Sequence, residues 1–215
     1  EVRQNRQKFF KQLNVAPARV VTAELEHQDT IIRVSSKDAG SGVLDNDYQL
    51  KADGLITNEP NLYLLHVVAD CLSLPYYDPQ HKAVGLAHIG WRNASSGLAK
   101  KIIKRMAEEF GTNPASLIVG LGPAIHSCCY AYPKHATQQL LDWQPYLKTE
   151  DSGLTHIDLV GFVLDQLKTT GVPTANIKVS SECTAHSPQF FSHYRSQRRN
   201  KPEGRLATLI GLKPN

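Results

Sequence analysis

The sequence predicts a single α+β domain in which clustered strands are covered by packing helices. Short apolar and β-branched runs, bounded by turn residues, are concentrated between residues 20 and 88. Longer segments with apolar residues at helical spacing accompany them. No internal repeat, low-complexity tract or linker divides the 215 residues, a length that suits one large domain.

The N-terminal part of the chain is expected to form a helix and then strands. Residues 3–13 place Phe9, Phe10 and Leu13 on or near one face of an amphipathic helix. Residues 35–46 are polar and Gly-rich, which predicts a loop. The expected strands of this part lie at 20–26, 30–34, 54–57, 62–68, 72–77 and 83–88.

The strongest helix signal follows at residues 94–110. Apolar side chains recur there at helical spacing, at Leu98, Ile102, Met106 and Phe110. Gly111 stands just past the end, where a left-handed C-cap favours glycine. The remaining expected elements are strands at 116–121, 176–180 and 206–212 and helices at 134–143 and 156–169.

Composition excludes several classes of protein. A hydrophobic fraction of 41% and a charged fraction of 20% are ordinary for a globular protein. The net charge of +4 permits an anionic small-molecule substrate and is too weak to indicate nucleic acid. No stretch is apolar enough to cross a membrane, and the opening residues do not resemble a signal peptide. The four cysteines form no CxxC pair, which favours reduced thiols and a cytoplasmic protein.

Two potential metal ligands follow apolar runs at the same end of the expected strands. Cys71 closes one run and His88 closes another, and such a pair begins a zinc site that a third ligand would complete. The same two residues could instead be a nucleophile and its base. Of the nine histidines, His27 is the best-placed third ligand, because it ends the strand expected at 20–26. His66 lies inside an apolar strand and is expected to be a satisfied core histidine.

Other motifs add candidate ligand contacts and remove some enzyme classes. Trp91 and Arg92 follow Gly90 and can line a ligand pocket. Residues 190–199 mix aromatic and cationic side chains, which suits a nucleoside or phosphate pocket, nucleic acid, or a solvated basic loop. The sequence has no HExxH, no HxE with PCxxC, and no HxH. These absences disfavour a zincin protease, a cytidine-deaminase zinc site and a trinuclear copper centre.

Five motifs stand out along the chain. They are Ala69-Asp70-Cys71-Leu72, Ala87-His88-Ile89-Gly90-Trp91-Arg92, Gly122-Pro123-Ala124-Ile125 with Cys128-Cys129-Tyr130, Cys183-Thr184, and Phe190-Phe191-Ser192-His193-Tyr194-Arg195. The same motifs occur in this order in the YfiH-like laccase-domain family, also called polyphenol oxidases and described as purine nucleoside phosphorylases. The chain resembles this family over nearly its whole length.

The resemblance implies an α/β/β/α layered sandwich with mixed sheets, as one domain over residues 1–215. It implies one zinc ion bound by His27, Cys71 and His88. The chain departs from the family in carrying Glu26 before and Gln28 after His27, where the family has Gln-Val-His-Gly. The family's further N-terminal segment, which supplies a pocket arginine, is expected to precede the residues given.

The resemblance implies a zinc-dependent purine nucleoside phosphorylase with adenosine deaminase side activity, whose partners are purine nucleoside and phosphate rather than nucleic acid or membrane. Cys71, His88 and Arg92 are the candidate catalytic residues. Arg92 and Arg195 are candidate anion contacts, and Asp70 is expected to orient a ligand by hydrogen bonding. The alternatives are a cysteine hydrolase using Cys71 and His88, a copper-dependent polyphenol oxidase, and a non-catalytic zinc-binding module.

Overall fold

The strands of the chain are grouped in three sheets in the computed structural model, which describes residues 2–44, 50–200 and 203–213. The central sheet has the order β11 (Ile177–Val179), β7 (Ile118–Leu121), β5 (Leu72–Asp78), β6 (Ala83–Ile89), β3 (Gly54–Thr57), β2 (Ile31–Arg33). The second has the order β1 (Val20–Val21), β4 (Tyr63–Val68), β12 (Leu206–Gly211). The third is a small sheet of β8 (Ala131–Tyr132), β10 (Thr155–Ile157) and β9 (Leu147–Thr149).

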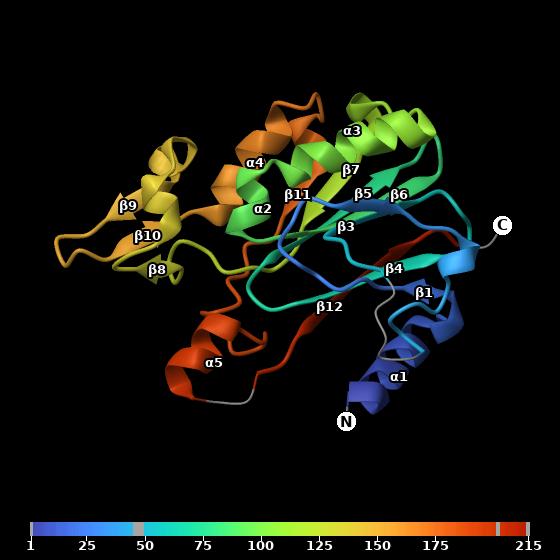
Figure 1. The fold of residues 1–215 in the computed structure, drawn as a ribbon, viewed down its shortest axis with the longest axis horizontal. Helices are drawn as coiled ribbons and strands as arrows, with labels where there is room; N and C mark the ends of the chain where they lie inside the picture. The colour runs from blue at the N-terminus through green and yellow to red at the C-terminus, as the bar shows by residue number, and fades with distance from the viewer. Residues whose placement is uncertain (1, 45–49, 201–202, 214–215) are drawn as a thin grey trace.

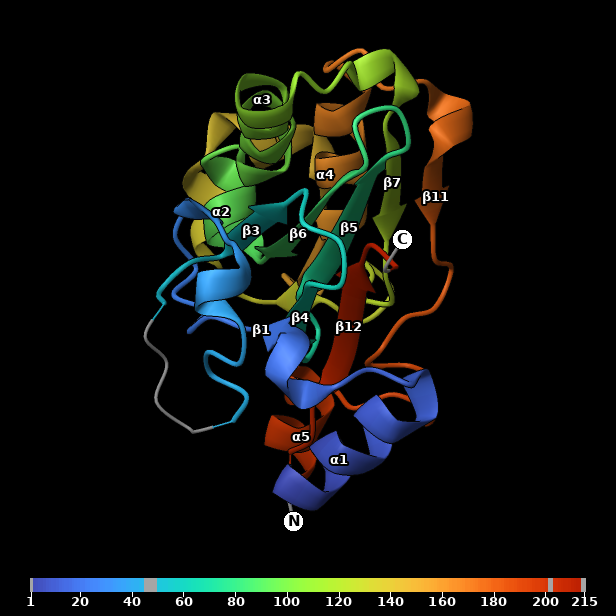
Figure 2. The same cartoon turned by 90° about the vertical axis from the view of Figure 1, so that its right-hand side faces the viewer.

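The two larger sheets and the helices form an α/β/β/α sandwich, as Figures 1 and 2 show. One face of the central sheet is covered by α2 (Trp91–Ser95), α3 (Leu98–Phe110) and α4 (Leu159–Lys168). Its other face meets the β1–β4–β12 sheet, whose outer face carries α1 (Val2–Leu13). Both large sheets mix parallel and antiparallel pairs. The predicted fold class is therefore confirmed.

Each interface between layers has its own apolar core. Ile102 and Met106 of α3 pack with Leu74 of the central sheet. Leu64 of β4 packs with Leu86 of β6 between the two sheets. Strand β6 is buried along its whole length because it has a layer on each face, which explains its unbroken apolar run.

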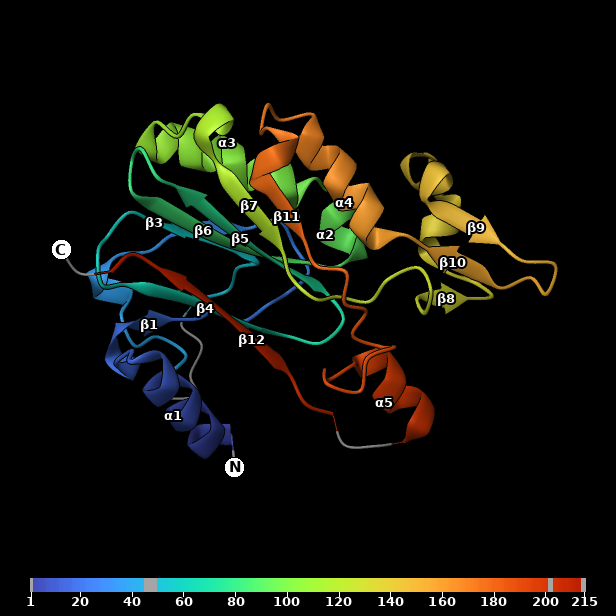
Figure 3. The same ribbon diagram turned by 180° about the vertical axis from the view of Figure 1, so that it is seen from behind.

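A proline interrupts the pairing of β7 with β5. Pro75 lies in the middle of β5 and has no N–H to donate, so the ladder with β7 covers Tyr76 and Tyr77 and resumes beyond the proline, where the N–H of Gly122 donates to the carbonyl of Ser73 at 3.1 Å. A Cβ atom on Gly120 would lie 3.1 Å from Cγ of Pro75, so the strands approach closely where a side chain is lacking. After β7 the chain leaves the sheet and runs towards β8 (Figure 3).

Two helix boundaries differ from the sequence prediction for local reasons. The helix expected at 94–110 is divided into α2 and α3, because Gly97 adopts a left-handed φ of 78°. The helix expected at 156–169 begins only after Asp158, whose carboxylate accepts the backbone N–H of Gly161 at 2.8 Å. The residues just before it form β10 instead.

Other elements were shorter than expected or were missed. The helix expected at 134–143 consists of short 3₁₀ segments, interrupted where Leu140 is extended (φ −101°, ψ 122°). The strand expected at 20–26 is only β1, followed by a single bridge between Glu24 and Lys51. In the loop expected at 35–46, residues 36–38 form a 3₁₀ turn, and residues 45 and 46 lie outside the described residues. The sequence analysis missed β8, β9 and the helix α5 (His193–Arg199).

None of the helices in the described ranges is both long and apolar enough to span a bilayer.

Candidate metal centre and its pocket

Three potential ligands from separate parts of the chain meet at one end of the central sheet. One donor atom of each of His27, Cys71 and His88 lies within 4.8 Å of the other two. Cys71 stands in the turn just before β5, and His88 is near the end of β6. These strands are antiparallel, with Ser73 opposite His88, so the start of one meets the end of the other. The ring centroids of His27 and His88 are 4.6 Å apart.

His27 reaches this position through a turn and not through a strand end. Its φ of 57° is left-handed, and β1 has already ended at Val21. The turn is folded over Asp53, whose carboxylate accepts the backbone N–H groups of Glu26 (3.2 Å), His27 (3.0 Å) and Gln28 (2.8 Å). The reason given from sequence for choosing His27 was therefore wrong, although its ring does lie beside Cys71 and His88.

Asp53 also fixes the orientation of His88. Its Oδ1 lies 2.7 Å from Nδ1 of His88, and both side chains are almost fully buried. With Nδ1 directed at the carboxylate, the other ring nitrogen faces Cys71, with which His88 also hydrogen-bonds. A carboxylate that holds a histidine in this way is the usual support of a zinc ligand.

Asp53 was not predicted from the sequence as part of the site, although the register of the strands points to it. Strand β3 pairs antiparallel with β6, with Gly54 opposite Ala87. The residues just beyond this pair are Asp53 and His88, and the backbone N–H of His88 donates to the carbonyl of Asp53 at 2.8 Å. Once these two strands are paired, a carboxylate next to the histidine is expected.

The protonation of the site depends on these contacts. Burial lowers the pKa of His88, but the hydrogen bonds and charges of Asp53 and Cys71 outweigh burial and raise the pKa to about 9. Burial and the charge of His88 lower the pKa of His27. Burial raises the pKa of Asp53, but the hydrogen bonds from His88 and from the backbone of Gln28 and His27 outweigh it and lower the pKa overall. The apo centre therefore carries a proton on His88 that a metal must displace.

The donor set suits a zinc-like metal ion. One thiolate and two imidazoles are borderline-soft ligands, and three protein ligands leave a position open for chemistry. The backbone is packed tightly against the donors at Gly90: a Cβ there would lie 2.8 Å from Nδ1 of His27 and 3.3 Å from Sγ of Cys71. Any other residue at position 90 would push the ligands apart.

The three donors line a pocket of about 660 Å³, a volume suited to a small-molecule ligand. Aromatic rings surround part of it, from Trp91, Tyr130, Tyr132 and His135. The guanidinium of Arg92 stacks on Trp91, 4.5 Å from the ring centroid. It lines the pocket and, within the part of the chain that the structure describes, makes no hydrogen bond or ion pair. Lys134, which the sequence analysis did not single out, lines the same pocket.

Asp70 lies on the pocket wall but is engaged with the C-terminal part of the chain. Its carboxylate accepts the hydroxyls of Thr184 (2.6 Å) and Ser192 (3.0 Å) and the backbone N–H of Tyr194 (2.6 Å). Burial raises its pKa, and the hydrogen bonds from the two hydroxyls offset this only in part. Asp70 therefore positions the segment that carries Tyr194, and no hydrogen bond joins it to Cys71 or His88 in the described residues.

Arg195 is turned away from the pocket. Its guanidinium donates to the backbone carbonyls of Thr184 (2.7 Å), Ala185 (3.1 Å), Ser187 (2.8 Å) and Phe190. These bonds hold the loop before α5 in shape. The placement gives no support to the anion contact expected of Arg195.

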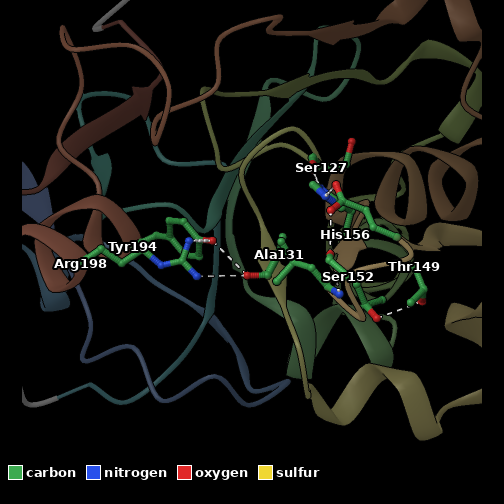
Figure 4. Close-up of polar contacts among 10 residues, drawn as sticks. Ser127, Ala131, Thr149, Ser152, His156, Tyr194 and Arg198 are labelled. Carbon is green, nitrogen blue, oxygen red and sulfur yellow. Dashed lines mark hydrogen bonds and ion pairs between the residues drawn. The ribbon is translucent and has the colours of Figure 1, made fainter.

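Helix α5 closes one side of the pocket through two contacts with β8. Figure 4 shows the hydroxyl of Tyr194 and the guanidinium of Arg198 both directed at the carbonyl of Ala131, at 3.0 and 3.3 Å. In β10, which pairs with β8, Nδ1 of His156 lies 2.6 Å from the carbonyl oxygen of Ser127 (Figure 4). The two hydrogen bonds to Ala131 hold α5 against the small sheet, and both elements contribute residues to the pocket lining.

Comparison with known proteins agrees with this architecture. The model of the family described as "Multi-copper polyphenol oxidoreductase laccase" matches residues 1–213. The protein named Purine nucleoside phosphorylase YlmD from Bacillus subtilis (strain 168) is 30% identical over 99% of this chain and 78% of its own length.

Solved structures give the same result. The hypothetical protein YfiH of Bacillus licheniformis is 36% identical with a TM-score of 0.90, over 99% of this chain and 81% of that one. YlmD from Geobacillus stearothermophilus is 30% identical with a TM-score of 0.91, over 99% and 80%. The resemblance drawn from the five motifs is confirmed, and the chain belongs to the multi-copper polyphenol oxidoreductase laccase, or YfiH-like, family.

Proposed function

We propose that this chain is a zinc-dependent purine nucleoside phosphorylase, and that adenosine deamination is a second reaction of the same centre. The observation that carries the proposal is that the His27, Cys71 and His88 donors open on the pocket that Arg92 also lines. The names of two relatives add support, because the YlmD proteins of Bacillus subtilis and Geobacillus stearothermophilus are both called purine nucleoside phosphorylases.

The pocket has separate features for the two substrates. The rings of Trp91, Tyr130 and Tyr132 offer flat apolar surfaces for a purine base. Arg92 and Lys134 offer positive charge, and a guanidinium matches the oxygens of phosphate with two parallel hydrogen bonds. Binding both substrates in one pocket would align phosphate with the ribose carbon that it attacks.

The proposed reaction balances without a further reactant. An oxygen of phosphate forms a bond to the anomeric carbon of ribose, and the bond from that carbon to the purine nitrogen breaks. The electron pair goes to the purine, which takes up the proton that phosphate loses. Arg92 would stabilise the phosphate anion throughout.

His27, Cys71 and His88 would hold the metal. Zinc in such a site supplies Lewis-acid character and activates water near neutral pH, which suits deamination. Asp53 keeps Nδ1 of His88 occupied, so the other nitrogen is available as a ligand.

The test is release of free base from inosine with and without phosphate. The proposal expects base and ribose-1-phosphate only when phosphate is present. Cys71→Ala should abolish both metal content and turnover, whereas Arg92→Ala should weaken the dependence on phosphate and leave the metal in place. Arg19→Ala, which changes an exposed arginine outside the pocket, is the matched control. Base release at the same rate without phosphate would refute phosphorolysis.

A cysteine hydrolase is the second candidate, because Asp53, His88 and Cys71 form a hydrogen-bonded chain like that of a nucleophile, its base and an orienting carboxylate. A cysteine-hydrolase mechanism, however, gives the imidazole of His27 no role. Elemental analysis of the purified protein, combined with a thiol-directed probe, separates the two. A stoichiometric metal favours the phosphorylase and distinguishes zinc from copper, whereas a metal-free protein labelled at Cys71 favours the hydrolase.

A further inference from the structure

A second group of sulfur atoms lies outside the candidate metal centre. One donor atom of each of Cys128, Cys129 and Cys183 lies within 4.8 Å of the other two. The sulfurs of Cys128 and Cys129 are 3.7 Å apart. From the sequence, these cysteines were expected only to be reduced thiols. That Cys183, far away in the sequence, joins the adjacent pair was not foreseen.

The backbone holds this group in place from both sides. Ala124 and Cys183 form a parallel bridge, and the N–H of Thr184 donates to the carbonyl of Ala124 at 2.9 Å. In the turn that carries the adjacent pair, the N–H groups of Cys129 and Tyr130 both donate to the carbonyl of His126, at 3.0 and 2.9 Å. The three sulfurs therefore meet on ordered backbone and not on loose loops.

The buried sulfur has the surroundings of a thiolate. Cys183 accepts the backbone N–H of His126 at 3.4 Å and also hydrogen-bonds the backbone of His186. N–H groups directed at a cysteine sulfur stabilise its anionic form, as they do around metal-bound thiolates.

We propose that Cys128, Cys129 and Cys183 form a second metal site, which binds a soft monovalent ion such as Cu(I) through three sulfurs. Soft thiolates select Cu(I), and the group contains no carboxylate or imidazole that would favour a harder ion. Zinc almost always takes four ligands in structural sites, and no fourth one joins this group among the described residues. On binding, each coordinating thiol forms a bond to the ion and loses its proton to solvent.

The site is open to exchange from one side. Cys128 is exposed and lines a separate cavity of about 490 Å³, together with Tyr146, Lys148 and His156. A chelator can therefore deliver and remove the ion. None of these residues lines the pocket of the first centre, so the proposal does not depend on the nucleoside chemistry.

The experiment uses the full chain with Cys71→Ser, so that the first centre contributes no thiolate. The anaerobic, reduced protein is titrated with Cu(I) against a coloured Cu(I) chelator. The background variant should retain one equivalent of Cu(I), and X-ray absorption should show sulfur as the only ligand type. Adding Cys128→Ser should abolish retention at the same chelator concentration. This side chain is exposed, so the change should leave the fold intact.

Ser127→Ala in the same background is the matched control, because it changes the neighbouring residue and leaves all three sulfurs; it should still retain one equivalent. Equal retention with and without Cys128→Ser would overturn the proposal. Retention of zinc in preference to Cu(I), or nitrogen and oxygen ligands in the absorption spectrum, would overturn the assignment of a soft three-sulfur site.

Discussion

Two buried aspartates near the pocket, Asp53 and Asp70, have different structural roles. Asp53 is fully buried and accepts three backbone N–H groups and the ring of His88. Asp70 is 7% exposed and accepts two hydroxyls and one backbone N–H. The pKa of Asp53 is lowered and that of Asp70 is raised. At Asp53 the hydrogen bonds from His88 and from the backbone of Gln28 and His27 outweigh burial, whereas at Asp70 burial outweighs the hydrogen bonds from the two hydroxyls.

The comparison shows that a carboxylate's role follows from what it bonds and not from its distance along the sequence to a ligand. Asp70 is adjacent to Cys71, yet it organises the segment that carries Tyr194. Asp53 is distant from the ligands in sequence, yet it orients two of them, His27 and His88. Replacing each aspartate in turn should therefore have different effects. Loss of Asp53 should disturb the metal ligands, whereas loss of Asp70 should displace the pocket wall.

Asp53→Ala should have the largest effect. It leaves three N–H groups and a protonated imidazole without their acceptor, which should cost about 3–5 kcal/mol in the free energy of unfolding. Metal content should fall with it, because His27 and His88 both lose their support. Chemical denaturation and elemental analysis of the same preparation check this. Normal metal content in a folded Asp53→Ala protein would show that the ligands do not depend on this carboxylate.

The pH dependence of metal binding should report on the same carboxylate. Because the pKa of His88 in the apo protein is about 9, a metal must displace its proton at neutral pH. The apparent affinity should rise by at least about tenfold per pH unit from pH 6.5, because His88 loses its proton to solvent and the Cys71 thiol must also be deprotonated, and the rise should level off in part above about pH 9, where His88 is already neutral. In Asp53→Asn the levelling should move to lower pH, since the charge that raises this pKa is removed. A titration at several pH values with a competing chelator measures both curves, and identical curves would contradict the role given to Asp53.

Asp70→Ala should destabilise the fold by about 2–4 kcal/mol, because two hydroxyls and one N–H lose a buried acceptor. In contrast with Asp53→Ala, its metal content should stay unchanged. Turnover should fall through displacement of Tyr194 from the pocket wall. Denaturation, elemental analysis and the inosine assay test the three parts, and loss of metal here would remove the distinction between the two aspartates.

Replacing His66 should have the smallest effect of these substitutions. Unlike the two aspartates, this buried side chain is not engaged in hydrogen bonds in the part of the chain that the structure describes. It is fully buried in β4, and neither ring nitrogen has a hydrogen-bond partner among the described residues, which contradicts the expectation of a satisfied core histidine. Burial, with a smaller contribution from the charge of His88, lowers its pKa to about 3. His66→Leu should raise the free energy of unfolding by about 1–3 kcal/mol at pH 7.

The sign of the pH effect follows from the same pKa. Between pH 6.5 and about 3, His66 binds a proton in the unfolded state but not in the folded state. This residue therefore makes the protein less stable as the pH falls through that range. His66→Leu should lose less stability than the wild type between pH 7 and pH 4, measured by urea denaturation. An equal loss in both proteins would show that His66 has a partner in solution.

Periodicity predicted the regular part of the fold well. The strands around β3 to β6 and the helical face of α3 follow directly from runs of apolar residues, because burial on both faces leaves little choice of residue type. The small β8–β10–β9 sheet could not be predicted in this way. Its strands have only two or three residues each, too few to show a period.

The candidate site could be predicted in part. Motif order selected His27, Cys71 and His88, which the fold brings together. Asp53 and the three-cysteine group depend on strand register and on a bridge between distant loops, and neither leaves a local pattern in the sequence. Arg195 was expected as an anion contact because it lies near aromatic residues, whereas in the structure its guanidinium donates to backbone carbonyls.

The pairing of β4 with β12 has a consequence for folding. This ladder joins Val68 to Leu206, and only β1, a strand of two residues, pairs with the other side of β4 (Figure 2). Until β12 docks, β4 presents an apolar edge with unpaired N–H and C=O groups, which is a template for association between chains. Contacts between such distant segments form slowly because a long loop must close first. The pairing of β12 with β4 thus both covers this edge and places Glu203 and Arg205, just before β12, in the wall of the pocket.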